Sequence, residues 1–151
     1  MIRYKMKGSL TASKESNAEG IIEPILIKHS IKYTQGKLMK IPNDKRRTMD
    51  FIIPDMENPE IIIESSNLAT TSSGMGDKAK AEIQMRRAIE KHYPNATFIG
   101  FNDGAGWLVR KNDLRRMVSG QDDVFTFHES ELIRFEHFLE RNLSKRCYAE
   151  K

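Results

Sequence analysis

The stretch MDFIIPDMENPEIIIESS, from Met49 to Ser66, determines the predicted centre of the fold. It holds two short apolar runs, residues 51–53 and 61–63, joined by PDMENP, which has Pro and Asn at turn positions. We therefore predict paired strands over residues 50–53 and 60–64. Asp50 stands just before the first apolar run, and Glu64 stands just after the second. Because antiparallel pairing brings the start of one strand beside the end of the next, both carboxylates are predicted to share one edge of the sheet.

Two carboxylates at one edge form a candidate metal site. They repel each other unless a divalent cation bridges them, and Mg²⁺ is the usual partner of a few carboxylates and phosphate oxygens. Such an ion can polarise a phosphodiester and lower the pKa of an attacking water. Acidic residues also flank strands simply because strand ends reach solvent, and the spacing leaves that alternative open. Asp55 is a second candidate for the first ligand, but a turn tip points away from the edge where Glu64 ends its strand.

Composition favours a single globular domain over residues 1–151, with the first twelve residues loose. The chain is 38% hydrophobic and 30% charged, with net charge +4 and a pI near 9.2, which favours a phosphate-bearing partner without requiring one. The single cysteine, Cys147, excludes an intramolecular disulfide, and we interpret it as an incidental residue of the tail. No apolar run has the length of a membrane span, and the N-terminus lacks a signal-peptide core, so we expect a cytoplasmic protein.

The rest of the chain predicts helices around a central mixed sheet, an α/β fold. A first helix is predicted to start at Ser13 or Ser16 and run to Ile31, with Pro24 indicating a late start or a kink. A second helix follows Asp77 as its N-cap. The other predicted elements are strands at residues 37–41, 96–101 and 107–110, a Gly-rich turn at 102–106, and helices at 113–118 and 129–143.

Two helices have clear buried faces in the predicted pattern. Apolar residues recur at helical spacing in both. The four in the second helix are Ala81, Met85, Ala88 and Ile89, and the four in the last helix are Leu132, Phe135, Phe138 and Leu139. The four histidines lack metal-ligand spacing, which argues against a zinc site.

Two segments carry candidate phosphate-binding groups. In TTSSGMGDKAK, glycines and a helix start allow backbone N–H groups to approach an anion. The basic run NDKRR leads into Asp50. Flexible loops and solvated charged faces explain such segments equally well. The candidate DNA contacts are Lys45, Arg46, Arg47, Ser72, Ser73, Lys78 and Lys80.

Three segments together resemble one family. MDFIIPDMENPEIIIESS, TTSSGMGDKAKAE and FIGFNDGAGWLVR, within residues 19–127, are similar to the catalytic core of type II restriction endonucleases of the PD-(D/E)XK nuclease superfamily, and in particular to GATC-recognising enzymes. The resemblance implies an α/β core and Mg²⁺-dependent hydrolysis of double-stranded DNA. It also implies a two-fold homodimer in which each subunit cuts one strand of a palindromic site. The length is that of a catalytic core with a reduced or absent recognition region.

By this resemblance, Asp50 matches the first metal-binding aspartate and Glu64 the second acidic ligand. The lysine expected two residues beyond the glutamate is Ser66 here, so the chain departs from the pattern. Lys78 or Lys80 could supply the missing ammonium, which stabilises developing negative charge. Alternatively, the serine positions water or the site is inactive. Glu19, preferred to Glu23 because Pro24 disturbs the latter, matches an additional acidic residue near the metal.

Three other functions remain open at this point. One is a structure-selective repair or junction nuclease of the same superfamily. Another is a non-catalytic DNA-binding module, in which Ser66 marks a degenerate active site. The last is an α/β domain whose acidic strand ends bind neither metal nor DNA.

Overall fold

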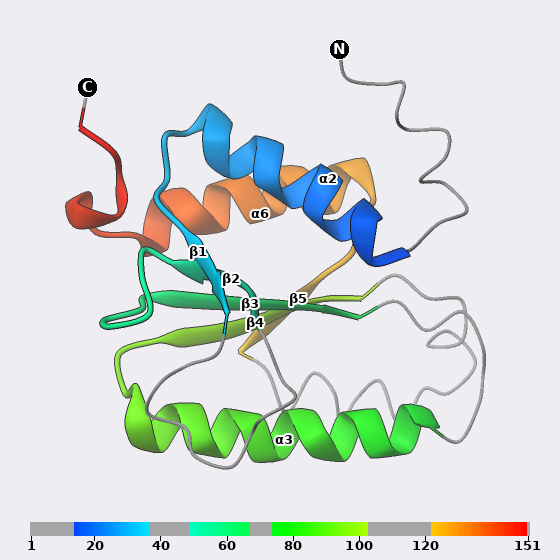
Figure 1. Cartoon of the computed structure of the whole chain (residues 1–151). Helices are drawn as coiled ribbons and strands as arrows, with labels where there is room; N and C mark the ends of the chain where they lie inside the picture. Colours follow the sequence, from blue (N-terminus) through cyan, green and yellow to red (C-terminus); the bar gives the residue numbers. More distant parts are fainter. Residues whose placement is uncertain (1–13, 37–48, 67–73, 103–121, 151) are drawn as a thin grey trace.

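The protein is represented by a computed structural model that describes residues 14–36, 49–66, 74–102 and 122–150. In these residues a twisted sheet lies between two helical layers (Figure 1). In chain order the elements are α2 (Lys14–Lys28), β1 (Thr34–Gly36), β2 (Met49–Ile53), β3 (Ile61–Ser66), α3 (Gly74–His92), β4 (Thr97–Asn102), β5 (Asp123–Phe125), α6 (Glu129–Asn142) and the 3₁₀ helix η1 (Lys145–Cys147). The predicted α/β class, a mixed sheet flanked by helices, is confirmed.

Five strands in the described part of the chain lie in the order β1-β2-β3-β4-β5. The pairs β1–β2 and β2–β3 are antiparallel, whereas the pairs β3–β4 and β4–β5 are parallel. The predicted hairpin is confirmed, since Phe51 pairs with Ile63 and Ile53 pairs with Ile61. Helix α3 makes the crossover between β3 and β4, as parallel pairing requires.

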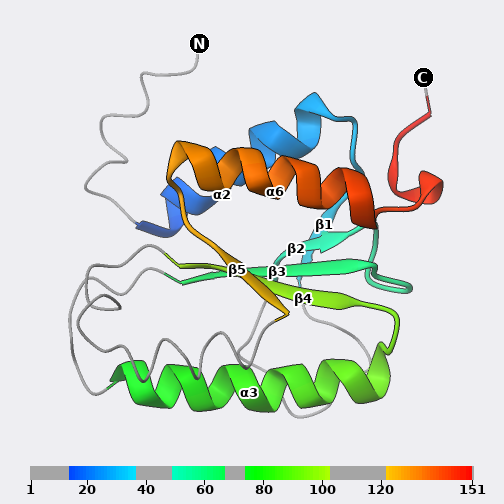
Figure 2. The ribbon, with the colours of Figure 1, turned by 180° about the vertical axis from the view of Figure 1, so that it is seen from behind.

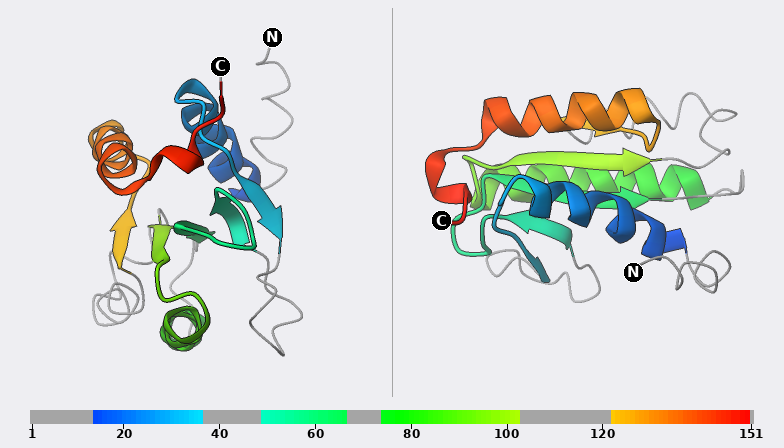
Figure 3. Two further views of the ribbon diagram at one scale, coloured as in Figure 1. Left: turned by 90° about the vertical axis from the view of Figure 1, so that its left-hand side faces the viewer. Right: turned by 90° about the horizontal axis from the view of Figure 1, so that it is seen from above.

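Both faces of the sheet are covered, which explains why β2 and β3 are apolar on both sides. Helices α2 and α6 lie side by side on one face, and α3 is the described helix on the other (Figures 2 and 3). Along β3 the side chains alternate accordingly. Ile61 and Ile63 belong to the core under α2 and α6, whereas Ile62 packs with Phe98 and the α3 residue Ile89.

Helix α6 closes the larger core with the face that its sequence predicts. Phe135, Phe138 and Leu139 are buried, and Leu132 packs beside them while half-exposed. The Phe135 ring packs edge-on against Phe101 of β4, with ring centroids 4.9 Å apart. In α3, Met85 and Ile89 are buried and Ala88 is half-buried, in accord with the predicted stripe. The side chain of Ala81 lies outside the described residues.

The first helix differs from the prediction. It runs from Lys14 through Pro24 and ends at Lys28, rather than continuing to Ile31. Pro24 is exposed, and Ala18, Ile22 and Leu26 on the opposite face are buried, so core packing outweighs the hydrogen bond that the proline removes. Ser13 lies outside the described residues, and Ser16 lies inside the helix rather than at its cap.

Other boundaries also shift. The strand expected at 37–41 lies outside the described residues, and β1 occupies Thr34–Gly36 just before them. Helix α3 begins at Gly74, so Asp77 is a residue of the first turn and the N-cap prediction is wrong. The turn residues 103–106, the strand at 107–110 and the helix at 113–118 fall outside the described residues. Strand β5 was not predicted.

The C-terminal segment is part of the core rather than a loose tail. Cys147 is buried, and its carbonyl accepts a hydrogen bond from the N–H of Lys32 at 2.7 Å. Tyr148 forms an antiparallel bridge with Ile31. The interpretation of Cys147 as an incidental tail residue is therefore wrong. None of the helices described is both long and apolar enough to cross a membrane.

Candidate active site

Asp50 and Glu64 meet at one edge of the sheet, as the hairpin predicts. Phe51 and Ile63 form the last regular pair at this end of β2 and β3, and Asp50 and Glu64 are the next residues on the two strands. This is the edge at which the parallel strands β3 and β4 end. Helices α2 and α3 both begin on that side of the molecule (Figures 1 and 2). The edge therefore combines two acidic strand ends with two helix starts.

Strand β2 has a bulge in the stretch that contains Asp50. Thr34 pairs with Ile52 and Gly36 with Met49, so β2 has an extra residue between these two positions. Met49 and Ile52 consequently both contribute to the α3-side core, while Phe51 faces α2 and α6. Bulges of this kind redirect a side chain and are frequent next to active sites.

Ser65, which lies between the candidate site residues Glu64 and Ser66, holds the Asp50 carboxylate. Its backbone N–H donates to Asp50 Oδ2 at 2.6 Å, and its hydroxyl donates to the same oxygen at 3.0 Å. This role was not predicted from the sequence. A serine in a strand has no distinguishing signal, and only the register and the bulge bring it to Asp50.

The electrostatics of this edge are those of crowded negative charge. Burial raises the pKa of Asp50, the two hydrogen bonds from Ser65 lower it, and the nearby charges of Glu64 and Glu19 raise it again. The net result is a pKa above the ordinary value. Asp50 is half-buried and Glu64 is only 8% exposed. Like charges held this way favour a divalent cation.

Glu19 lies on α2 near this edge and is exposed. Its Oε2 accepts a hydrogen bond from Gln35 Nε2 of β1 at 3.1 Å. Glu23, the alternative, is occupied differently, since its carboxylate accepts the hydroxyl of Tyr33. Together with burial, that hydrogen bond raises the pKa of Tyr33 to about 12. Of the two glutamates, only Glu19 adds to the field at Asp50.

Among the described residues, no group of three or more His, Cys, Asp or Glu side chains lies close enough together to hold a metal ion. The candidate metal centre thus consists of the Asp50 and Glu64 pair with Glu19 further away. The two carboxylates fit a divalent cation by charge and burial, and water or phosphate oxygens are the usual remaining ligands of Mg²⁺.

The candidate lysines are only partly described. Ser66 is the last residue of β3 and pairs with Asn102 of β4 in the parallel register, but its side chain lies outside the described residues. Lys78 and Lys80 belong to the first two turns of α3, the helix that starts on this side of the sheet. The Lys80 side chain is exposed, and that of Lys78 is outside the described set. The candidates Lys45, Arg46, Arg47, Ser72 and Ser73 lie wholly outside it.

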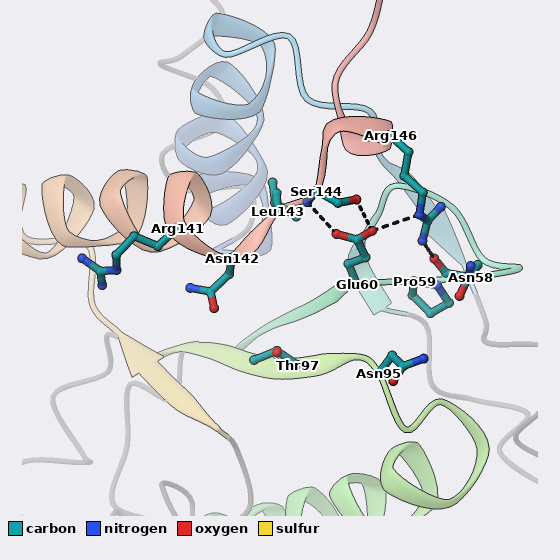
Figure 4. Close-up of a pocket in the computed structure, with 10 residues that line it drawn as sticks. All are labelled: Asn58, Pro59, Glu60, Asn95, Thr97, Arg141, Asn142, Leu143, Ser144 and Arg146. Carbon is teal, nitrogen blue, oxygen red and sulfur yellow. Dashed lines mark hydrogen bonds and ion pairs between the residues drawn. The ribbon is translucent and has the colours of Figure 1, made fainter.

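A cavity of about 420 Å³ opens at the opposite end of the sheet, where β3 and β4 begin (Figure 4). Ser144 N–H donates to Glu60 Oε1 at 2.9 Å, and the Ser144 hydroxyl donates to Glu60 Oε2. Arg146 Nε lies 2.9 Å from the same Oε2. The charged groups at the centre of this cavity therefore neutralise each other.

Asp55 belongs to this far end. Its Oδ1 accepts the N–H of Asn58 at 2.8 Å, and its Oδ2 lies 3.8 Å from Arg146 Nη1. The hairpin thus separates the two aspartates that competed for the role of first ligand. Asp50 lies at the Glu64 edge, and Asp55 lies at the turn.

Comparison with known proteins gives one family. The model of the DpnII restriction endonuclease family matches residues 6–135, most of the chain, including β2, β3 and the Asp50–Glu64 edge. No curated protein and no solved structure gives a significant match to this chain.

Proposed function

We propose, from the premise that the chain belongs to the DpnII restriction endonuclease family, that it is a Mg²⁺-dependent, sequence-specific type II endonuclease whose active site is the edge formed by Asp50 and Glu64. The family implies endodeoxyribonuclease activity with DNA as the substrate, and restriction endonucleases generally use divalent metal ions. The metal identity, the site residues and the specificity are the parts proposed.

The observation that carries the proposal is the meeting of Asp50 and Glu64 at the edge where β3 ends. They are the residues next to the last regular β2–β3 pair, both are shielded from solvent, and each raises the electrostatic cost of the other's charge. Among the described residues, the charges that act on Asp50 are those of Glu64 and Glu19, and both are negative. A bound divalent cation would offset this repulsion.

Asp50 and Glu64 bind Mg²⁺, and Glu19 adds negative charge from α2. The ion supplies the chemistry of polarising the scissile phosphate and lowering the pKa of the attacking water. An ammonium from Lys78 or Lys80 stabilises the charge that develops on the phosphate, in place of the lysine absent at Ser66. This assignment is supported by the start of α3 on the same side of the sheet.

DNA is bound through its phosphates by the basic and hydroxyl-bearing segments around this edge. The proposed contacts are Lys45, Arg46, Arg47, Ser72, Ser73, Lys78 and Lys80. Each neutralised phosphate steepens the salt dependence of binding. The enzyme acts as a two-fold homodimer, because a palindromic site presents the same bond on each strand to two identical subunits.

The test is cleavage of a synthetic duplex that contains GATC. Mg²⁺ is added at about 10 mM, on the order of the concentration needed to saturate such a site. Asp50→Asn and Glu64→Gln are compared with the unmodified chain, and Glu60→Gln serves as the matched control from the other end of β3. Discrete products from the unmodified chain and the control, absent from both site variants, support the proposal. A duplex with the four bases scrambled tests sequence specificity.

A second candidate is a DNA-binding module with a degenerate active site. Ser66 at the lysine position favours it, as does the lack of a three-ligand group among the described residues. In that case the protein binds the duplex in a salt-sensitive manner but does not cut it. The Asp50→Asn variant then binds DNA with the affinity of the unmodified chain, apart from the effect of the changed charge. A branched DNA substrate in the same assay separates the structure-selective nuclease from both.

A further inference from the structure

Ser65 and Ser144 make the same pair of donations to a carboxylate at opposite ends of β3. At the far end, the two donors of Ser144 go to different oxygens of Glu60, so both oxygens are used. At the Asp50 edge, both donors of Ser65 go to Oδ2. Within the described residues, no hydrogen bond to Asp50 Oδ1 accompanies them. One serine satisfies its carboxylate, and the other leaves an oxygen open.

The backbone explains why Ser65 can do this. The regular pairing of β2 with β3 runs from Ile53–Ile61 to Phe51–Ile63, and the bulge in β2 follows at once. Ser65 lies beyond the last regular pair, and its N–H donates to the Asp50 side chain. Two hydrogen bonds to one oxygen fix both the position and the rotation of a carboxylate better than one can.

On the premise of the proposed function, we propose that Ser65 is a positioning residue that locks the Asp50 carboxylate through Oδ2 and thereby presents Oδ1 to the divalent cation. Ser65 does not touch the DNA or the ion in this role. Its hydroxyl restricts the rotation of the Asp50 carboxylate, which together with Glu64 would hold the divalent cation. Losing a hydrogen-bond partner of a metal ligand typically weakens metal binding by about 10- to 100-fold.

The experiment compares Ser65→Val with Ser65→Thr, which have the same shape and differ in the hydroxyl. Binding of Mn²⁺ alone, without DNA, is followed by the electron paramagnetic resonance signal of the free ion. Ser144→Ala is the matched control, because it removes the equivalent hydroxyl at the far end of the same strand. Thermal unfolding of each variant shows that the protein tested is folded.

The expected result is a loss of about tenfold in Mn²⁺ affinity for Ser65→Val, with near-normal affinity for Ser65→Thr and Ser144→Ala. Cleavage by Ser65→Val should require correspondingly more Mn²⁺ and recover at saturation. Equal affinity of the Val and Thr variants overturns the inference, and so does an equal loss in Ser144→Ala. If the unmodified chain binds no Mn²⁺, or binds it as Asp50→Asn does, the proposed function itself fails.

Discussion

Each end of β3 has a carboxylate that accepts the N–H and the O–H of one serine, yet the two ends differ in charge. At the amino end, Glu60 faces Ser144 and the guanidinium of Arg146, which lies 2.9 Å away. At the carboxyl end, Asp50 faces Ser65 and two further acidic residues, Glu64 and Glu19. Each carboxylate thus accepts two hydrogen bonds from one serine, but the described charges beside the two carboxylates are opposite in sign.

The pKa shifts follow this difference. Burial raises the pKa of Glu60, but the hydrogen bonds from Ser144 and the charge of Arg146 outweigh it and bring the pKa below its ordinary value. Burial also raises the pKa of Asp50. There the hydrogen bonds from Ser65 are opposed by like charges, and the pKa stays above its ordinary value. At the first end a guanidinium lies beside the carboxylate, whereas the charges that act on Asp50 among the described residues are both negative.

This difference supports the proposed division, in which the amino end of β3 contributes to stability and the Asp50 edge to catalysis. A neutralised network ties the C-terminal segment to the hairpin and contributes to folding. A cluster of partly buried like charges costs folding energy and is retained where a ligand compensates it. This division has measurable consequences for cleavage, stability, cation binding and pH dependence.

The largest effect is on cleavage. Asp50→Asn or Glu64→Gln should reduce the rate at least about 100-fold, because metal ligands act on several kcal/mol of transition-state energy and each 1.36 kcal/mol is tenfold. Glu60→Gln, the same change at the other end, should leave the rate within about twofold. Initial rates on the GATC duplex measure all three. A loss in Glu60→Gln as large as in Glu64→Gln would contradict the division.

The next effect is on stability at the amino end. Glu60→Ala removes the acceptor of three donors and should lower the free energy of unfolding by about 2 kcal/mol, since hydrogen bonds to charged groups contribute about 1.5–3 kcal/mol. Arg141→Ala is the control, because Arg141 lines the same cavity but is exposed. It should change stability by less than about 0.5 kcal/mol. Urea unfolding provides the comparison, and equal losses in both variants would refute this role for Glu60.

Much of this architecture is predictable from sequence because its signals are local. The apolar runs at 51–53 and 61–63 predict both strands and their pairing, and the spacing of Phe135, Phe138 and Leu139 predicts the buried face of α6. Strand β5 gave no such signal, because a three-residue strand is too short to show periodicity. Pro24 misled the prediction, since three buried residues on the other face hold the helix through it.

The candidate site is predictable only in part for the same reason. The edge shared by Asp50 and Glu64 follows from antiparallel pairing alone. The roles of Ser65 and Cys147 do not, because they depend on a bulge and on a C-terminal segment that returns to residue 31. Sequence patterns within one element cannot encode contacts between distant ones. The network of Glu60, Ser144 and Arg146 was missed on the same grounds.

A smaller effect is expected from adding the cation. Mg²⁺ at ten times its dissociation constant should stabilise the unmodified chain by about 1.4 kcal/mol, because an ion that binds only the folded state adds its binding free energy. Asp50→Asn should show little of this gain, whereas Glu60→Gln should keep it. Thermal unfolding with Mg²⁺ or with a chelator measures the difference. Equal stabilisation of the two variants would mean that the ion binds elsewhere.

The smallest effect is on the pH dependence of stability, and its sign should be opposite at the two ends. Asp50 has a raised pKa, so its contribution in metal-free protein is present below the unfolded value of 3.8 and is lost as pH rises through the folded-state pKa. Glu60 has a lowered pKa, so its contribution is present above 4.5 and is lost as pH falls through the folded-state value. The free energy of unfolding, measured with a chelator from pH 3 to 7 (roughly the span over which carboxyl groups titrate), tests both signs. Relative to the unmodified chain, Asp50→Asn should gain stability as pH rises and Glu60→Gln should lose it. Parallel curves for the two variants would show that both ends of β3 are electrostatically alike, and the division between them would fail.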